Sequence, residues 1–217
     1  MKFHILSVIP EAFGEYFNHS IIGRAQKRDI IDIRVHDIRD WTSDKHHKVD
    51  DSPFGGGPGM VMKVEPIYKA IVALKSKIKS QKSKVRTILF STRGKAFTNK
   101  EAKRLSKYEN LILICGRYEG VDERVAKHIV DEEISVGNFV LSGGEIPAMI
   151  VIDAVSRFIP GVLGKKESLE EIKGSYSTYT RPEIFIPEKS SKKWPVPKVL
   201  LSGDHKKIEE WRKNNRY

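Results

Sequence analysis

Three loops rich in glycine and polar residues occur close together in the second half of the chain. The first begins at Gly116 and the second at Gly137, each after a short apolar run, and the third covers residues 142–147. Ligands bind just beyond the carboxyl ends of parallel strands, where glycine lets backbone amides approach closely. The spacing therefore favours a small-molecule pocket, although ordinary strand-to-helix turns would explain it equally well.

Two charged side chains beyond these loops could take part in chemistry. Arg157 falls late in the apolar helix expected after the third loop. It would either contact the negative end of that helix dipole or present a cation to a substrate oxygen. Glu167 follows in a polar stretch, and by itself it cannot be distinguished from a solvated carboxylate.

Two other patterns suggest chemistry only superficially. Residues 55–59 read GGGPG, which has neither the order of a P-loop nor that of a dinucleotide-binding loop. This argues against nucleoside triphosphate and dinucleotide cofactors. His46 and His47 are adjacent, so in regular structure they cannot both face one metal ion, and we expect a solvated loop there.

The elements that must position these loops alternate along the chain. The order predicts an α/β fold with a mostly parallel sheet and helices on both faces. The polar stretch 39–60 is too long for an ordinary connection and is typical of a functional loop. We expect strands at 3–9, 30–38, 85–90, 111–115 and 133–136, and helices at 11–17, 21–28, 64–79, 99–108, 121–128 and 145–158.

Composition limits the classes of protein that fit. The chain has 217 residues, 39% of them hydrophobic, which is enough for a real core. No apolar run approaches the ~20 residues that span a bilayer, and the N-terminus lacks a signal peptide's features, so we expect a cytoplasmic protein without a membrane partner. The single cysteine, Cys115, excludes an internal disulfide and a cysteine-based zinc site.

Charge is distributed unevenly. The net charge is +11; residues 63–107 hold 14 Lys or Arg against 2 Asp or Glu, and residues 161–217 hold 13 against 8. Residues 108–160, which carry the glycine loops, hold 4 against 9. A basic surface beside a less basic pocket suits a polyanion such as RNA, although lysines that only improve solubility would give a similar count.

The chain changes character near residue 160. We expect a first domain at 1–160, a polar linker at 161–179 and a small basic C-terminal domain at 180–217. The last of these holds several prolines and then an amphipathic helix at 205–214, for which Asp204 is the expected N-cap.

Five sequence blocks, taken in order, resemble those of a known enzyme family. They are DDSPFGGGPGM at 50–60, CGRYEGVDER at 115–124, SVGNFVLSGGEIP at 135–147, YTRP at 179–182 and VLLSG at 199–203. Together they resemble the bacterial tRNA (guanine-N1)-methyltransferases, the TrmD family of the knotted SPOUT methyltransferases. The resemblance runs from residue 1 to about residue 212.

The resemblance implies a deep trefoil knot and an obligate homodimer with active sites between the subunits. It also implies transfer of a methyl group from S-adenosylmethionine to N1 of the guanine immediately 3′ of the anticodon, with magnesium required. By motif, the donor pocket would comprise Phe90, Ser91, Thr92, Gly94, Gly116, Tyr118, Glu119, Gly120, Ser135, Val136, Gly137, Leu141, Gly143, Gly144 and Pro147.

The same resemblance assigns two catalytic roles. A carboxylate must remove the N1 proton, and a cation can stabilise the negative charge that then develops on O6. Arg157 matches the family's arginine for the second role. The family's base is an aspartate twelve residues before the tyrosine of YTRP, where this chain has Glu167, one methylene longer.

This chain departs from the family pattern at several positions. Asn138 replaces an aspartate, Thr92 and Arg93 replace Pro-Gln, and residues 173–175 replace an apolar-acidic segment. The chain ends at Tyr217 where relatives continue, so we expect a shortened C-terminal domain. The nearest alternative is a related SPOUT enzyme that methylates ribose 2′-hydroxyls, but such enzymes lack the 50–60 loop and YTRP, which argues against it. The change to Glu167 and the shortened C-terminus leave open a non-catalytic RNA-binding protein of the same fold.

Overall fold

The chain divides into two units, Met1–Gly164 and Lys165–Tyr217. The structure is a computed structural model that describes residues 1–78, 83–164, 174–188 and 192–216. Within these residues, no helix combines the length and the apolar character needed to cross a bilayer.

A five-stranded parallel sheet forms the centre of the first unit. Its strand order is β2-β1-β6-β5-β7, and every neighbouring pair is parallel. This confirms the predicted α/β class with a mostly parallel sheet. The strands are β1 (Lys2–Ser7), β2 (Asp32–Asp37), β5 (Val85–Ala96), β6 (Asn110–Ile114) and β7 (Glu132–Ser135).

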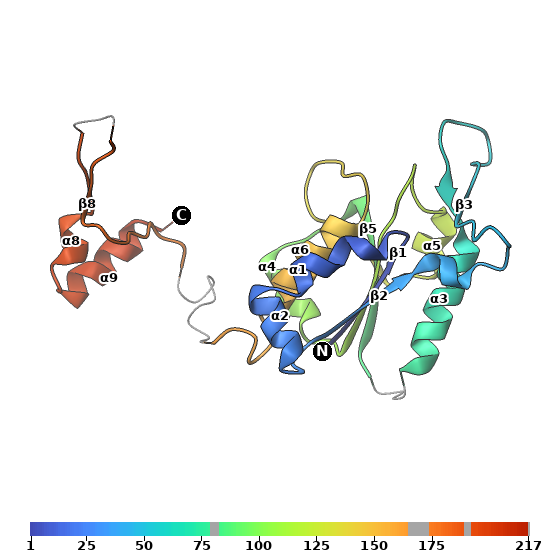
Figure 1. The fold of residues 1–217 in the computed structure, drawn as a ribbon, viewed down its shortest axis with the longest axis horizontal. Coiled ribbons are helices and arrows are strands. Elements are labelled where there is room, and N and C mark those ends of the chain that lie inside the picture. The colour runs from blue at the N-terminus through green and yellow to red at the C-terminus, as the bar shows by residue number, and fades with distance from the viewer. Residues whose placement is uncertain (79–82, 165–173, 189–191, 217) are drawn as a thin grey trace. The chain divides into compact units, whose positions relative to one another are not determined.

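Helices cover both faces of this sheet (Figure 1). One face carries α1 (Gly14–Phe17), α2 (Ser20–Lys27), α4 (Asn99–Leu105) and α6 (Glu145–Ser156), and the other carries α3 (Val64–Lys77) and α5 (Glu123–His128). The remaining elements of the unit are the 3-10 helices η1 (Pro10–Phe13) and η2 (Ile38–Trp41) and an antiparallel pair, β3 (Asp50–Asp51) and β4 (Val61–Met62).

The central strand β6 supplies residues to both hydrophobic cores. Leu111 and Leu113 pack with the cluster beneath α2, α4 and α6, and Ile112 and Ile114 pack with the cluster beneath α3. All four are fully buried. Successive side chains of a strand point to opposite faces, so an unbroken apolar run is what a strand covered on both sides requires.

Strand β5 differs from the prediction, because it does not end at Phe90. It continues to Ala96, with a register shift against β7 between Phe90 and Lys95. A Cβ at Gly94 would lie 2.6 Å from the backbone nitrogen of Ile134, so glycine permits the close approach of the two strands. The irregularity moves residues 91–93 out of the regular ladder.

Capping residues set several helix boundaries. Thr98 caps α4 as predicted, with its side chain accepting a hydrogen bond from the Glu101 backbone nitrogen. Helix α5 begins at Glu123 rather than at Val121, because the Asp122 side chain accepts from the Arg124 backbone nitrogen and so acts as its N-cap.

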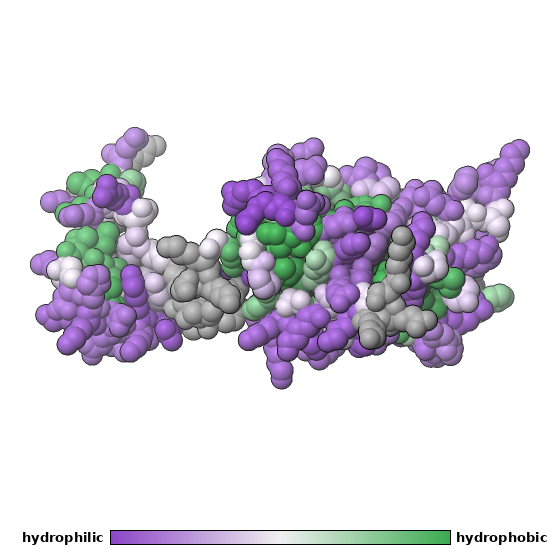
Figure 2. Space-filling model, turned by 90° about the horizontal axis from the view of Figure 1, so that it is seen from below, coloured by the Kyte–Doolittle hydropathy of each residue, from purple (hydrophilic) through white to green (hydrophobic). Residues whose placement is uncertain are grey.

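The second unit contains a short hairpin and two helices. Strand β8 (Ile184–Phe185) pairs antiparallel with β9 (Trp194–Pro195), and α8 (Lys198–Leu201) precedes α9 (His205–Asn214). Asp204 caps α9 as predicted. No residue in the described part of this unit is fully buried, and Figure 2 shows hydrophobic side chains at its surface among hydrophilic ones.

A histidine pair between β1 and β2 makes the first unit sensitive to acid. His4 Nδ1 lies 3.2 Å from His36 Nε2, and the two rings are stacked. Burial, with the nearby His36 and Arg34, lowers the pKa of His4 from its ordinary 6.5 to about 4, and burial also lowers that of His36. As pH falls from 6.5 to about 4, the unfolded chain therefore binds protons that the folded chain does not.

We expect the free energy of unfolding to be lower by about 2 kcal/mol at pH 5 than at pH 7 through His4 alone. Urea unfolding of the His4→Phe variant, whose ring cannot be protonated, should show a correspondingly weaker pH dependence. His19→Phe, at an exposed site, is the control. Equal pH dependence of the His4→Phe variant and the unaltered protein would contradict this assignment.

Candidate functional site

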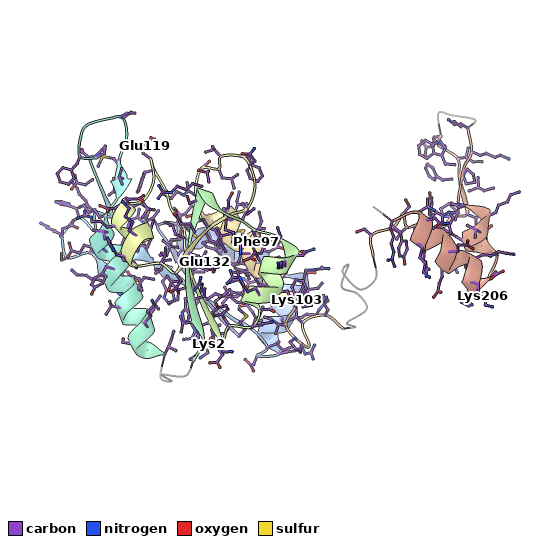
Figure 3. The ribbon with its side chains drawn as sticks, turned by 180° about the vertical axis from the view of Figure 1, so that it is seen from behind. Lys2, Phe97, Lys103, Glu119, Glu132 and Lys206 are labelled. Carbon is purple, nitrogen blue, oxygen red and sulfur yellow. The ribbon has the colours of Figure 1, made fainter. Side chains whose placement is uncertain are left out.

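A cavity of about 430 Å³ lies beside the irregular part of β5 and the carboxyl ends of β6 and β7. Its walls come from residues 89–93, the loop after β6, the end of β7 and the loop leading into α6. Glu119 is one of the lining residues, and Figure 3 shows it near the carboxyl ends of the strands. Lys2, at the start of β1, lies at the opposite end of the sheet. The volume is within the range of ligand-binding pockets.

The structure brings together nearly all of the residues expected in the donor pocket. The lining includes Phe90, Ser91, Thr92, Gly116, Tyr118, Glu119, Gly120, Ser135, Val136, Gly137, Leu141, Gly143, Gly144 and Pro147. Gly94 is not in the lining, because it lies against the backbone of β7. Its effect on the cavity is indirect, through the strand irregularity that leaves Ser91 and Thr92 at the wall.

The first and third glycine loops touch through their backbones. The Gly144 nitrogen donates a hydrogen bond of 2.9 Å to the Gly116 oxygen. A Cβ at position 144 would lie 2.5 Å from the Cα of Cys115, closer than real Cβ atoms approach backbone. Glycine at 144 is thus needed for loop packing, in addition to any contact with a ligand.

We expect Gly144→Ala to lower the free energy of unfolding by about 1–3 kcal/mol, the usual cost of overpacking, and to weaken binding in the cavity. Thermal unfolding and ligand titration would measure the two effects. Gly14→Ala is the matched control, since a Cβ there meets nothing within 4 Å. A Gly144→Ala protein as stable as the control would show that the two loops separate at little cost.

Cys115 lies beneath this junction and is chemically protected. It is fully buried, and burial raises the pKa of its thiol well above the ordinary value. The thiolate form needed for nucleophilic chemistry is therefore disfavoured. We conclude that Cys115 has a packing role.

The long polar stretch is attached to the pocket loop by backbone hydrogen bonds. Glu119 N donates to Met60 O at 3.0 Å, and Met62 N donates to Gly120 O at 2.9 Å. The segment that contains β3 and β4 therefore lies beside the cavity. Phe54, in the connection between β3 and β4, is fully exposed.

Charged side chains that the sequence analysis did not select also line the cavity. Arg93, on the irregular part of β5, pairs with Glu123 on α5 and with Glu133 on β7, the latter at 3.3 Å. The Arg93 guanidinium lowers the pKa of Glu123. The sequence marked Arg93 only as a departure from the family pattern, because its pairing depends on the register shift.

A second charged pair joins the loop after β6 to the start of α6. Arg117 Nε lies 3.1 Å from an oxygen of Glu145, whose other oxygen accepts a hydrogen bond of 2.8 Å from Ser7. Glu145 and Ser7 are almost completely buried. Ser7 lies in none of the sequence motifs, and no local pattern predicts its contact with Glu145, because the two residues lie 138 positions apart.

Arg157 lies at the far end of α6 from the cavity. It is the C-cap residue of this helix, whereas Gly144 is the N-cap. At 1.5 Å per residue the two positions are about 20 Å apart along the helix axis, further than an arginine side chain reaches. Within one chain the structure therefore does not bring Arg157 to the cavity. Glu167 lies outside the described residues.

Metal binding was expected from the resemblance. Among the residues that the structure describes, no group of three His, Cys, Asp or Glu side chains is placed to hold a metal ion. Glu123 and Glu133 in the cavity wall are already paired with Arg93. No ligand for magnesium is therefore assigned.

The tRNA (guanine-1)-methyltransferase (TrmD) family model matches residues 1–217. Three similar proteins, each named tRNA (guanine-N(1)-)-methyltransferase, come from Carboxydothermus hydrogenoformans, Ruminiclostridium cellulolyticum and Clostridioides difficile. They are 51%, 50% and 47% identical to this chain over 98% of its length, and the matches cover 81%, 89% and 91% of those proteins. The chain therefore belongs to the tRNA (guanine-1)-methyltransferase family.

Proposed function

We propose that this chain transfers a methyl group from S-adenosylmethionine to N1 of the guanine immediately 3′ of the anticodon in tRNA. The observation that carries the proposal is the family match across residues 1–217, which includes every loop that lines the cavity. Residues 1–160 would form the methyltransferase domain, 161–179 the linker and 180–217 the tRNA-binding domain.

The cavity fits the methyl donor in size and in the nature of its wall. Glycine loops expose backbone amides and carbonyls that can bind the edge of an adenine, and Phe90, Val136 and Leu141 offer apolar contacts to its ring. When bound, the donor supplies an electrophilic methyl group on a sulfonium, which needs alignment more than activation. The knotted arrangement expected for this family stays a prediction.

The nucleophile requires two protein groups. Guanine N1 carries a proton, and we assign its removal to Glu167 as general base. Negative charge then develops on O6, and we assign its stabilisation to the Arg157 guanidinium. No step in this scheme passes through a metal ion. Magnesium dependence stays a prediction.

The position of Arg157 supports an active site shared by two chains. One chain cannot place this side chain over its own cavity, but a second copy packed along α6 could. Ile146 and Ile150 are exposed and lie on the same face of α6 as Arg157, since their spacing is 4 and 7 residues. We therefore propose a homodimer that buries this face and works in the cytoplasm, where tRNA is available.

The direct test is to incubate the protein with labelled S-adenosylmethionine and tRNA and to locate the methylated nucleoside by mass spectrometry. We expect 1-methylguanosine next to the anticodon. Label on a ribose would favour the related 2′-O-methyltransferases. No transfer, with tRNA still bound, would favour a non-catalytic RNA-binding protein.

We also expect tRNA binding to weaken steeply with salt, because Lys and Arg side chains would displace counterions from the phosphates. With six to ten phosphate contacts, the affinity should fall by about 10³–10⁵ between 50 and 200 mM salt. Fluorescence anisotropy at several salt concentrations measures this slope. A flat response would show that the basic segments do not contact phosphate.

A further inference from the structure

Arg117, Glu145 and Ser7 form one connected cluster at the cavity wall. Both carboxylate oxygens of Glu145 are engaged, one by Arg117 Nε at 3.1 Å and the other by Ser7 Oγ at 2.8 Å. Ser7 is fixed in turn, because its Oγ accepts a hydrogen bond of 3.0 Å from the Ile9 backbone nitrogen. Glu145 is 5% exposed and Ser7 is 0% exposed, so the carboxylate is held rigidly.

The third glycine loop leaves room for this cluster. A Cβ at Gly143 would lie 2.5 Å from both Arg117 Nε and an oxygen of Glu145. Gly143 and Arg117 both line the cavity. Glycine at this position therefore lets the ion pair reach the wall of the cavity.

The Arg117 guanidinium has N–H donors that its contact with Glu145 does not use. Its hydrogen bond to Glu145 uses Nε, and among the described residues no hydrogen bond involves either of its Nη atoms. The Arg117 side chain is 29% exposed, whereas that of Glu145 is 6% exposed. A guanidinium fixed at one edge presents its remaining N–H groups in a planar fork suited to a carboxylate or a phosphate.

Stability alone does not explain the cluster. Placing a charged carboxylate in the interior costs free energy, and a buried ion pair often contributes no more than apolar residues of similar size. A pair that opens onto a cavity has a further use, because it fixes the direction of an anion-binding group.

We propose that Arg117 binds an anionic oxygen of a ligand in this cavity, and that Glu145 and Ser7 are positioning residues that orient its guanidinium. The inference rests on the proposed function, which offers two sources for that oxygen. One is the carboxylate of S-adenosylmethionine, and the other is a phosphate of the tRNA.

The first arm of the test measures donor binding by calorimetry, using S-adenosylmethionine and its decarboxylated analogue. If the donor carboxylate is the anion, Arg117→Gln should weaken binding of S-adenosylmethionine by about 10- to 100-fold and leave binding of the analogue unchanged. Arg117→Lys should recover part of the loss, because it keeps the charge but not the paired donors.

The second arm measures methylation against tRNA concentration. If the anion is an RNA phosphate, Arg117→Gln should leave the affinity for both donors unchanged and raise the KM for tRNA by about tenfold. It should also lower the slope of log affinity against log salt by about 1.

The positioning role is tested by non-additivity. Glu145→Gln should weaken binding of the same ligand as Arg117→Gln does, and Ser7→Ala should weaken it to a smaller extent. The double variant that carries Arg117→Gln and Glu145→Gln should bind this ligand no worse than Arg117→Gln alone. Glu101→Gln is the matched control: Glu101 is also 5% exposed and pairs with Arg104 at 2.8 Å, but it does not line the cavity. It should lower the melting temperature without changing ligand binding.

Unchanged binding of both donors and of tRNA by a folded Arg117→Gln protein would overturn the inference. If the losses of ligand affinity caused by Arg117→Gln and by Glu145→Gln add in full in the double variant, the positioning role of Glu145 would be overturned. Failure of the unaltered protein to bind S-adenosylmethionine or to methylate tRNA would instead overturn the proposed function itself. Calorimetry on the unaltered protein therefore comes first.

Discussion

Replacing Glu167 by glutamine is expected to lower the single-turnover rate of methyl transfer by about 10²–10⁴-fold, the usual contribution of a general base. The amide cannot accept the N1 proton at neutral pH, so N1 stays a poor nucleophile. The affinity for S-adenosylmethionine should be unchanged, because the base acts on guanine. Rapid-quench kinetics and calorimetry would measure the two quantities.

Two kinds of control sharpen this experiment. Glu170→Gln and Glu171→Gln remove nearby carboxylates in the same polar stretch and should leave the rate within a few-fold. Glu167→Asp restores the residue that the family carries at this position and should retain activity. A Glu167→Gln enzyme that methylates at close to the normal rate would exclude Glu167 as the base.

Arg157→Ala is expected to lower the rate of methyl transfer by about 10²–10³-fold, the effect of removing one donor to a developing oxyanion. Because Arg157 lies at the far end of α6 from the cavity of its own chain, it should act on the cavity of a second copy. This arrangement predicts that two inactive chains can complement each other.

The complementation partner is Leu141→Trp, a bulky substitution in the cavity wall that should block donor binding. Each variant alone should be inactive. Mixed and re-formed dimers should recover about a quarter of normal activity, since about half of a random mixture is mixed dimers and each of these has one complete site. No recovery, with mixed dimers shown to form, would place Arg157 and the cavity of one chain in the same active site.

The sequence predicted the parts of the fold that depend on local pattern. The apolar run in β6 identified a strand covered on both faces, and the side chains of Thr98 and Asp204 identified helix starts. These features depend on a few consecutive residues. The parallel sheet then followed from the alternation of strands and helices.

Where a feature depends on contacts between distant residues, the sequence-based prediction was wrong or was missing. The extension of β5 to Ala96 depends on its second pairing with β7, which no local pattern around Gly94 reveals. The link from Ser7 to Glu145 joins the first strand to the sixth α-helix. The remoteness of Arg157 from the cavity likewise appears only once α6 is placed.

The burial of Cys115 has a practical consequence for biophysical work. The protein has a single cysteine, and it is shielded from reagents. Dyes would therefore react only where new thiols are introduced, for example at the exposed positions of Lys107→Cys and Glu209→Cys. Energy transfer between such dyes would turn the separation of the two units into an optical signal, which can be followed as tRNA is added.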